Sequence, residues 1–171
     1  RIAVRAATRH GVKWLTLYTF STENWGRQTA EVEAIMTLFC KTVMNEAKEL
    51  AANGVRVWIM GERTRFSQEV LQMIDYIEQT TRHAETLNLV LAFNYSSQRE
   101  LVLATQSLAR KVAKGEMSSE EISAESIQRE LFLPEMPNPD LIIRTSGECR
   151  LSNFLLWQAA YAEFYFPEVL W

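Results

Sequence analysis

The chain has 171 residues, of which 47% are hydrophobic and 23% charged, and its formal net charge is −3 at pH 7. These values predict a globular domain with a full core and exclude a disordered chain. The negative charge argues against general nucleic-acid binding, which requires a basic surface. No uninterrupted apolar stretch is long enough to span a bilayer.

Apolar residues recur at helical spacing in several long segments, and short runs of β-branched and aromatic residues separate them. In chain order, the predicted helices span residues 1–10, 30–52, 67–87 (with Ser67 as N-cap), 98–114 and 123–132. The predicted strands span residues 14–20, 55–60, 88–93, 140–144 and 162–166. This alternation predicts an α/β fold, a single domain over residues 1–171 with a central, mostly parallel sheet flanked by helices.

The cysteines and histidines predict neither a disulfide framework nor a zinc site. Cys40 and Cys149 lie far apart in the sequence, and His10 and His83 have no partner at zinc-binding spacing. Two isolated cysteines suit a reducing compartment. We therefore expect a cytoplasmic protein, or an organellar one if the source is a eukaryote.

Ligands bind beyond the carboxyl ends of the strands in parallel α/β sheets, which selects the loops at 21–29, 94–99 and 145–152. The sequence contains neither a G-x-G-x-x-G fingerprint nor a P-loop. Its only aspartates are Asp75 and Asp140, so an aspartate-rich motif for metal and diphosphate is excluded. A phosphate site in this chain must therefore use other groups.

The first of these loops begins with S-T-E-N-W-G-R. Ser21, Thr22, Asn24 and Arg27 offer hydrogen-bond donors, and Trp25 offers a large apolar face. This mixture suits an anion attached to an apolar body. An ordinary polar loop that the tryptophan anchors to the core would have the same composition, so both interpretations stand at this point.

Two arginines six residues apart flank a turn in R-T-S-G-E-C-R-L-S-N. Arg144 ends a predicted buried strand, and Arg150 and Ser152 follow the turn. Guanidinium groups match phosphate oxygens, and a short helix capped by Ser152 or Asn153 would add backbone N–H donors for an anion. The alternative is that the arginines pair with nearby carboxylates such as Glu148.

Glu163 is the single carboxylate in the apolar run A-A-Y-A-E-F-Y-F. It occupies either a surface or edge position, or a metal site in which one or two carboxylates and phosphate oxygens hold Mg²⁺. The apolar residues of the helices at 30–52 and 67–87 pack on the sheet, and the same surface can line a channel for a hydrocarbon chain.

Three blocks in order resemble the cis-prenyltransferase family, whose best-known type is undecaprenyl diphosphate synthase. L-T-L-Y-T-F-S-T-E-N-W-G-R (15–27) is similar to that family's L-T-L-Y-A-F-S-T-E-N-W-x-R, and L-N-L-V-L-A-F-N-Y (87–95) resembles its third block. The segment from D-L-I-I-R to F-P-E-V-L-W (140–171) resembles its C-terminal signature. The blocks span the chain without a large insertion.

The resemblance implies a homodimer of α/β subunits, each with a hydrophobic tunnel. It implies an Mg²⁺-dependent transferase that condenses isopentenyl diphosphate with an allylic diphosphate such as farnesyl diphosphate. The product would be a polyprenyl diphosphate with new cis double bonds, a lipid that partitions into membranes. We therefore expect the protein in the cytoplasm, including the membrane face.

The resemblance also assigns roles to individual residues. The isopentenyl diphosphate site would consist of Arg144, Arg150, Leu151 and Ser152. The substrate site on a mobile loop would consist of Ser21, Thr22, Glu23, Trp25 and Arg27. Glu163 would be a metal ligand, and Glu31 matches an acidic position near the loop. Asn24 is the family's assigned proton-removal residue, but a neutral amide is a poor general base. We expect it to orient a water or a phosphate oxygen that takes the proton.

Three features depart from the family pattern. The N-terminal block H-x-x-x-M-D-G-N-x-R-W, with its Mg²⁺-binding aspartate, is missing, so we expect a domain truncated at both ends that is inactive alone. Cys149 stands where many members have Gln or His, and Ser96-Ser97-Gln98 replaces Gly-Gly-Arg. The alternative function is a non-catalytic structural subunit of a heteromeric cis-prenyltransferase, although such partners lose the substrate motifs present here.

Overall fold

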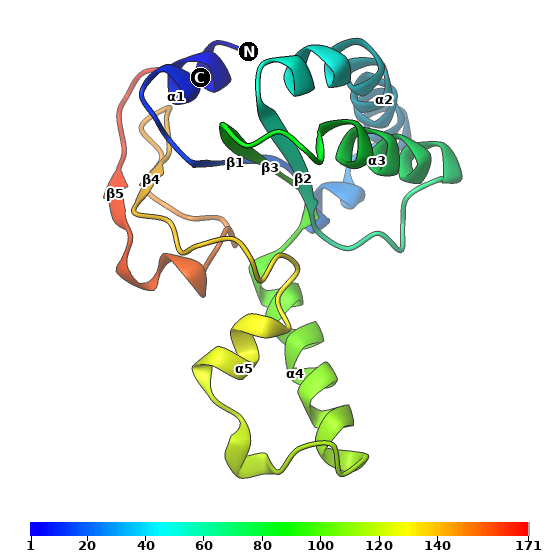
Figure 1. The fold of residues 1–171 in the computed structure, drawn as a ribbon, viewed down its shortest axis with the longest axis vertical. Coiled ribbons are helices and arrows are strands. Elements are labelled where there is room, and N and C mark those ends of the chain that lie inside the picture. The colour runs from blue at the N-terminus through cyan, green and yellow to red at the C-terminus, as the bar shows by residue number, and fades with distance from the viewer. Residues whose placement is uncertain (171) are drawn as a thin grey trace. The chain divides into compact units, whose positions relative to one another are not determined.

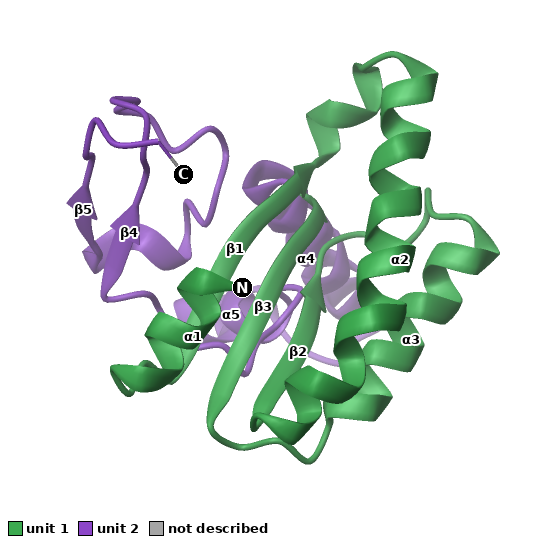
Figure 2. Ribbon diagram, turned by 90° about the horizontal axis from the view of Figure 1, so that it is seen from above, with its two compact units in different colours: residues 1–95 green, residues 96–171 purple. Residues whose placement is uncertain are grey.

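The structure, a computed structural model, describes residues 1–170. The chain divides into two compact units, Arg1–Tyr95 and Ser96–Trp171 (Figure 2). Helices and parallel strands alternate along the chain, as Figure 1 shows, and the predicted parallel α/β class is confirmed. In the part that the structure describes, no helix is long and apolar enough to cross a membrane.

The first unit is built on a parallel sheet of three strands. Its elements in chain order are α1 (Ile2–Arg9), β1 (Trp14–Ser21), the 3₁₀ helix η1 (Thr22–Gly26), α2 (Thr29–Ala52), β2 (Val55–Met60), α3 (Gln68–Thr81) and β3 (Leu87–Tyr95). The strand order is β1-β3-β2. β3 is buried along most of its length because it has a strand on each side and helices pack on the sheet.

The helices α2 and α3 lie side by side against this sheet (Figures 1 and 2). The buried side chains of α2 recur at helical spacing, as in Val32, Phe39 and Val43. Phe93 of β3 stacks on Phe39 with ring centroids 4.5 Å apart and on Phe66 at 5.0 Å. The aromatic core thus lies under the carboxyl end of β3, where parallel strands present their ligand-binding loops.

The helix α3 begins as predicted but ends six residues earlier than predicted. Ser67 is its N-cap and accepts a hydrogen bond from the Val70 backbone. At the other end, the Thr81 hydroxyl donates to the Ile77 carbonyl and accepts from the Val57 N–H of β2. This buried side chain couples the end of the helix to the sheet, and the following residues lead into β3 rather than extending the helix.

The second unit contains α4 (Ser97–Ala113), the 3₁₀ helix η2 (Ser119–Glu121), α5 (Ala124–Arg129), β4 (Leu141–Ile143), the 3₁₀ helix η3 (Gln158–Tyr161) and β5 (Glu163–Tyr165). The strands β4 and β5 pair in parallel and form a separate two-stranded sheet. α5 is shorter than predicted, because the Phe132 N–H donates to the Glu100 carboxylate of α4 instead of continuing the helix.

The predicted helix beginning at Ser152 or Asn153 is wrong. Both residues have left-handed backbone angles, with φ of 50° and 63°, and Leu155 has φ of 49°. A right-handed helix cannot begin on such a run. The backbone N–H groups of a helix start are therefore not part of this loop.

Candidate functional site

The loop after β1 closes on itself through Asn24. Its side-chain oxygen accepts a hydrogen bond from the Ser21 backbone N–H at 2.9 Å, which folds the segment into the 3₁₀ helix η1. Arg27 forms an exposed ion pair with Glu31 of α2 at 2.5 Å. The Asn24 side-chain oxygen therefore has a structural role in the loop. Glu31 holds the Arg27 guanidinium at the end of the loop, next to α2.

Trp25 anchors the loop to the core. Its indole N–H donates to the Asn94 side-chain oxygen at 2.7 Å, and its ring packs edge-on against Phe20 at 5.3 Å. The Arg65 guanidinium lies 4.7 Å from the ring centroid, at cation–π distance. The interpretation of Trp25 as an anchor is thus confirmed, and the anchor also brings a cation to its face.

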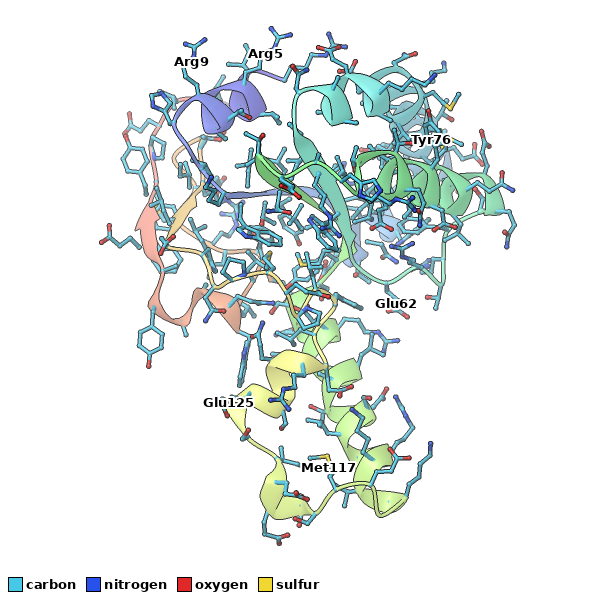
Figure 3. All side chains as sticks on the ribbon, in the orientation of Figure 1. Arg5, Arg9, Glu62, Tyr76, Met117 and Glu125 are labelled. Atoms are coloured by element: carbon cyan, nitrogen blue, oxygen red, sulfur yellow. The ribbon has the colours of Figure 1, made fainter. Side chains whose placement is uncertain are left out.

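Asn94 begins the predicted ligand-binding loop at 94–99, but the sequence did not predict its contact with Trp25. Its side chain is 1% exposed, its φ is 55°, and its amide N–H donates to the Glu62 carbonyl at 2.5 Å. Glu62, labelled in Figure 3, follows β2. The signal available in the sequence was an asparagine at the end of a strand, since asparagine tolerates left-handed angles.

Three further residues of the loop, Ser21, Thr22 and Glu23, differ in how far they are buried. The Thr22 hydroxyl is buried and has no hydrogen-bond partner among the described residues. A buried hydroxyl without a partner costs free energy, so a ligand that bonded to it would gain from that contact. Glu23 is exposed. Ser21, which ends β1, is partly buried.

A cavity of about 390 Å³ lies beside Trp25. Its volume is typical of a small-molecule site. The cavity is lined by apolar side chains of α2, α3 and the segments before them, by two hydroxyl groups and by three charged groups: Trp25, Val32, Glu33, Met36, Thr37, Cys40, Arg65, Phe66, Ser67, Glu69 and Val70. Burial raises the pKa of the Cys40 thiol, and the negative charge of Glu69 raises it further, so Cys40 is a neutral part of this lining at pH 7.

In the second unit, Arg144 organises the loop that follows β4. Its guanidinium donates to the Arg150 carbonyl at 2.5 Å and to the Ser152 hydroxyl at 2.7 Å. Arg150 forms an ion pair with Glu148, and both side chains are more than a third exposed. The structure therefore brings the two arginines and the serine of the predicted site together, and it also contains one of the carboxylate pairs considered as the alternative.

The rest of this loop is conformationally constrained. Ser146 has φ of 68°, and together with the run at 152–155 it places four non-glycine residues at positive φ. Such angles cost about 1–3 kcal/mol each and cluster at ligand-binding sites. Leu151 is partly buried, whereas Cys149 is exposed, with its sulfur 3.8 Å from the Gly147 carbonyl oxygen.

Glu163 begins β5 and is exposed, and its backbone N–H donates to the Asp140 carbonyl at 2.9 Å. Its carboxylate therefore lies on the surface of the strand pair β4–β5. Across residues 1–170, the structure contains no group of three or more His, Cys, Asp or Glu side chains that could hold a metal ion.

Compared with known families, residues 1–171 match the sequence model of "Putative undecaprenyl diphosphate synthase" over their whole length. The chain belongs to this family. The resemblance seen in the sequence is thereby confirmed. A relative of the undecaprenyl diphosphate synthase family in Haemophilus ducreyi, named ditrans,polycis-undecaprenyl-diphosphate synthase ((2E,6E)-farnesyl-diphosphate specific), is 47% identical over all 171 residues. The chain covers 71% of that relative.

Other members of the synthase family and solved structures agree with this assignment. An isoprenyl transferase of Brucella suis is 47% identical over the whole chain, which covers 67% of it. The structure of lavandulyl diphosphate synthase from Lavandula x intermedia with dimethylallyl diphosphate has a TM-score of 0.92 at 29% identity, over 96% of this chain and 72% of that one. "A probable undecaprenyl diphosphate synthase" from Campylobacter jejuni has a TM-score of 0.85 at 32% identity, over 98% and 76%.

Proposed function

We propose that the protein elongates cis-prenyl chains by condensing isopentenyl diphosphate with an allylic diphosphate such as farnesyl diphosphate. The observation that carries the proposal is the 47% identity, over all 171 residues, with a relative named as a farnesyl-diphosphate-specific undecaprenyl-diphosphate synthase. Two features, one in each unit, support the proposal: cationic groups that can pair with a diphosphate, and a cavity whose apolar side chains can contact a hydrocarbon chain.

Isopentenyl diphosphate binds, in this proposal, to the loop of Arg144, Arg150, Leu151 and Ser152. The Arg144 guanidinium already orients the Ser152 hydroxyl, so both groups can reach the same anion. Arg150 would exchange its exposed partner Glu148 for a diphosphate oxygen, an exchange that costs little because exposed ion pairs contribute only about 0–1 kcal/mol. Charged hydrogen bonds to the diphosphate would contribute about 1.5–3 kcal/mol each.

The allylic substrate binds, in this proposal, at the loop of Ser21, Thr22, Glu23, Trp25 and Arg27, with its hydrocarbon chain in the cavity. The buried Thr22 hydroxyl and the Arg65 guanidinium above Trp25 are groups that a diphosphate can use. Val32, Met36 and Val70 offer apolar walls to a prenyl chain. Asn24 holds the loop closed through Ser21, which favours an orienting role over that of a base.

Mg²⁺ is the metal that fits the proposed reaction, with Glu163 as its protein ligand. A carboxylate is the hard oxygen ligand that Mg²⁺ prefers, and one carboxylate with diphosphate oxygens and waters is a common arrangement. The charge that develops on a departing diphosphate is neutralised by such an ion when it is bound. We also propose that the protein is cytoplasmic and forms a homodimer. Light scattering on the purified full-length chain would test the dimer.

The proposed reaction is tested with the full-length chain, Mg²⁺, farnesyl diphosphate and radiolabelled isopentenyl diphosphate. We expect label in products that extract into butanol. Arg144→Lys should raise the KM for isopentenyl diphosphate by about tenfold or more, because a lysine lacks the planar fork with which one arginine nitrogen bonds Arg150 and Ser152 while the others remain for the anion.

Arg5→Lys is the matched control, since Arg5 is an exposed residue of α1 (Figure 3) whose only described ion pair is with Glu49 at 3.7 Å. Its kinetic constants should equal those of the wild type. Failure of the wild-type chain to incorporate label with farnesyl, geranyl or dimethylallyl diphosphate would overturn the proposed function.

A further inference from the structure

We propose that Ser96 and Ser97, at the start of α4, are positioning residues that hold the 144–153 loop in its diphosphate-binding conformation. The inference rests on the proposed function, because it assigns a purpose to the loop that contains Arg144, Arg150 and Ser152. Neither serine touches the expected substrate site in this scheme. The Ser96 hydroxyl acts through Asn153, the residue that follows Ser152, and the Ser97 hydroxyl acts through the Leu156 backbone.

Asn153 caps the first turn of α4 from outside the helix. The Ser97 N–H donates to the Asn153 carbonyl at 2.9 Å, and the Gln98 N–H donates to the Asn153 side-chain oxygen at 2.9 Å. The Arg99 N–H donates to the Ser96 hydroxyl at 3.4 Å. Three N–H groups that a helix start leaves unpaired are therefore satisfied, two of them by one residue of the loop.

The two serine hydroxyls complete this connection. Ser96 accepts a hydrogen bond from the Asn153 side-chain amide at 2.7 Å, and Ser97 accepts one from the Leu156 backbone N–H at 3.0 Å. Ser96 is 4% exposed and Ser97 is fully buried, so water cannot easily replace either bond. Glycine at these positions, as in the family pattern described above, would leave both loop donors without these partners.

The loop needs such external bonds because its own backbone is strained. Ser152, Asn153 and Leu155 have positive φ, a conformation that persists only when surrounding contacts enforce it. Asn153 and Leu156, the two partners of the serines, lie within and just after this run. The serines thus fix the backbone next to the Ser152 hydroxyl to which Arg144 donates.

Buried hydrogen bonds of Glu100 also attach α4 to the segment that follows the loop. Glu100, one turn further along α4, accepts hydrogen bonds from the Gln158 side chain at 3.1 Å and from the Phe132 backbone at 3.0 Å. Both Glu100 and Gln158 are at most 2% exposed. The segment that follows the loop is therefore tied to the same helix, which makes α4 a rigid support rather than a mobile neighbour.

The test compares the full-length wild type with the Ser96→Ala/Ser97→Ala double variant and with Thr105→Ala. Thr105 lies on the exposed side of α4, and its hydroxyl donates only to the Leu101 carbonyl of the same helix in the described contacts, so it controls for the loss of a hydroxyl. Ser96→Thr keeps a hydroxyl and a preferred N-cap residue, and it should retain wild-type behaviour.

The double variant should raise the KM for isopentenyl diphosphate about tenfold, with the KM for farnesyl diphosphate unchanged and kcat within about twofold. Amide exchange of residues 145–156, followed by mass spectrometry, should become about tenfold faster. Unchanged constants and unchanged exchange would overturn the inference. An equal rise in both KM values with a lower melting temperature would overturn it too, because that result indicates a merely structural role.

A failure of the proposed function would be recognised separately, since the wild type itself would then incorporate no label. In that case the exchange measurement decides the inference, with inorganic diphosphate as the probe. Diphosphate should slow exchange of residues 145–156 in the wild type and in Thr105→Ala, and should do so about tenfold less effectively in the double variant. Equal slowing in all three proteins would refute the positioning role.

Discussion

Asn94→Ala should lower the stability of the first unit by more than the removal of a polar side chain usually does. The substitution leaves the Trp25 indole N–H and the Glu62 carbonyl without the partners that they have at 2.7 and 2.5 Å. Because Asn94 itself is buried, the loss of each bond costs about 1 kcal/mol or more. Alanine at φ of 55° adds about 1 kcal/mol of backbone strain.

The sum is about 3 kcal/mol, which for a chain of this length lowers the melting temperature by about 6–12 °C. Urea unfolding of the full-length protein, followed by circular dichroism, measures the free energy directly. Asn94→Gly also removes the side chain but accepts the left-handed angle, so it should be about 1 kcal/mol more stable than the alanine variant. The difference between the two variants isolates the backbone strain.

Asn88→Ala is the matched control for this prediction. Asn88 lies on the same strand and also accepts a hydrogen bond from a tryptophan indole, that of Trp58 at 2.9 Å, but in a partly exposed position. Water can replace the lost partner there, so the cost should be about 1 kcal/mol. If Asn94→Ala cost no more than Asn88→Ala, the reasoning about burial and backbone angle would be refuted.

Two further predictions concern positions outside the binding loops. Gly61→Ala would place a Cβ 2.1 Å from the Phe93 carbonyl oxygen at φ of +150°, so it should lower the free energy of unfolding by about 3 kcal/mol or more. Gly115→Ala, with open space around it, should lower it by about 1 kcal/mol. Urea unfolding of both variants measures the difference. Lys111 lowers the pKa of Glu130, so their contact stabilises the fold above the carboxyl's unfolded pKa of 4.5, and that stability is lost as pH falls through the lowered pKa. Glu130→Gln should therefore cost about 0.5 kcal/mol at pH 7 and progressively less as the pH is lowered through the pKa of Glu130 in the folded protein, and a cost that does not change with pH would contradict the ion pair's contribution.

Sequence periodicity predicted the helices and strands well wherever burial alone decides the structure. The apolar spacing of α2, with Val32, Phe39 and Val43 facing the core, fixes its extent to within one residue at each end. The end of α3 could not be predicted in this way. It depends on a hydrogen bond between Thr81 and Val57, which lie 24 residues apart, and no local pattern contains that contact.

In the candidate site, too, contacts within one short loop could be predicted and contacts between distant residues could not. The neighbours Arg144, Arg150 and Ser152 could be predicted because they share one short loop, although the left-handed backbone that replaces the expected helix could not. The contacts that hold the two loops in place join Trp25 to Asn94 and Ser96 to Asn153, across 69 and 57 residues. Such contacts follow from the tertiary fold, and the sequence offers only the residue types that permit them.

The order of strands in the first sheet determines when β1 can pair with β3 during synthesis of the protein. Within residues 1–170, β1 pairs with β3 in the register Trp14 to Asn88, and this pairing cannot form until β3 has left the ribosome. At about 5–20 residues per second, that interval lasts roughly 4–15 s. During this interval β1 lacks its β3 neighbour, and the inner faces of α2 and α3 lack the β3 part of the sheet as each helix is completed. We therefore expect nascent chains to depend on chaperones that bind hydrophobic segments, and this dependence should end abruptly once residue 95 emerges.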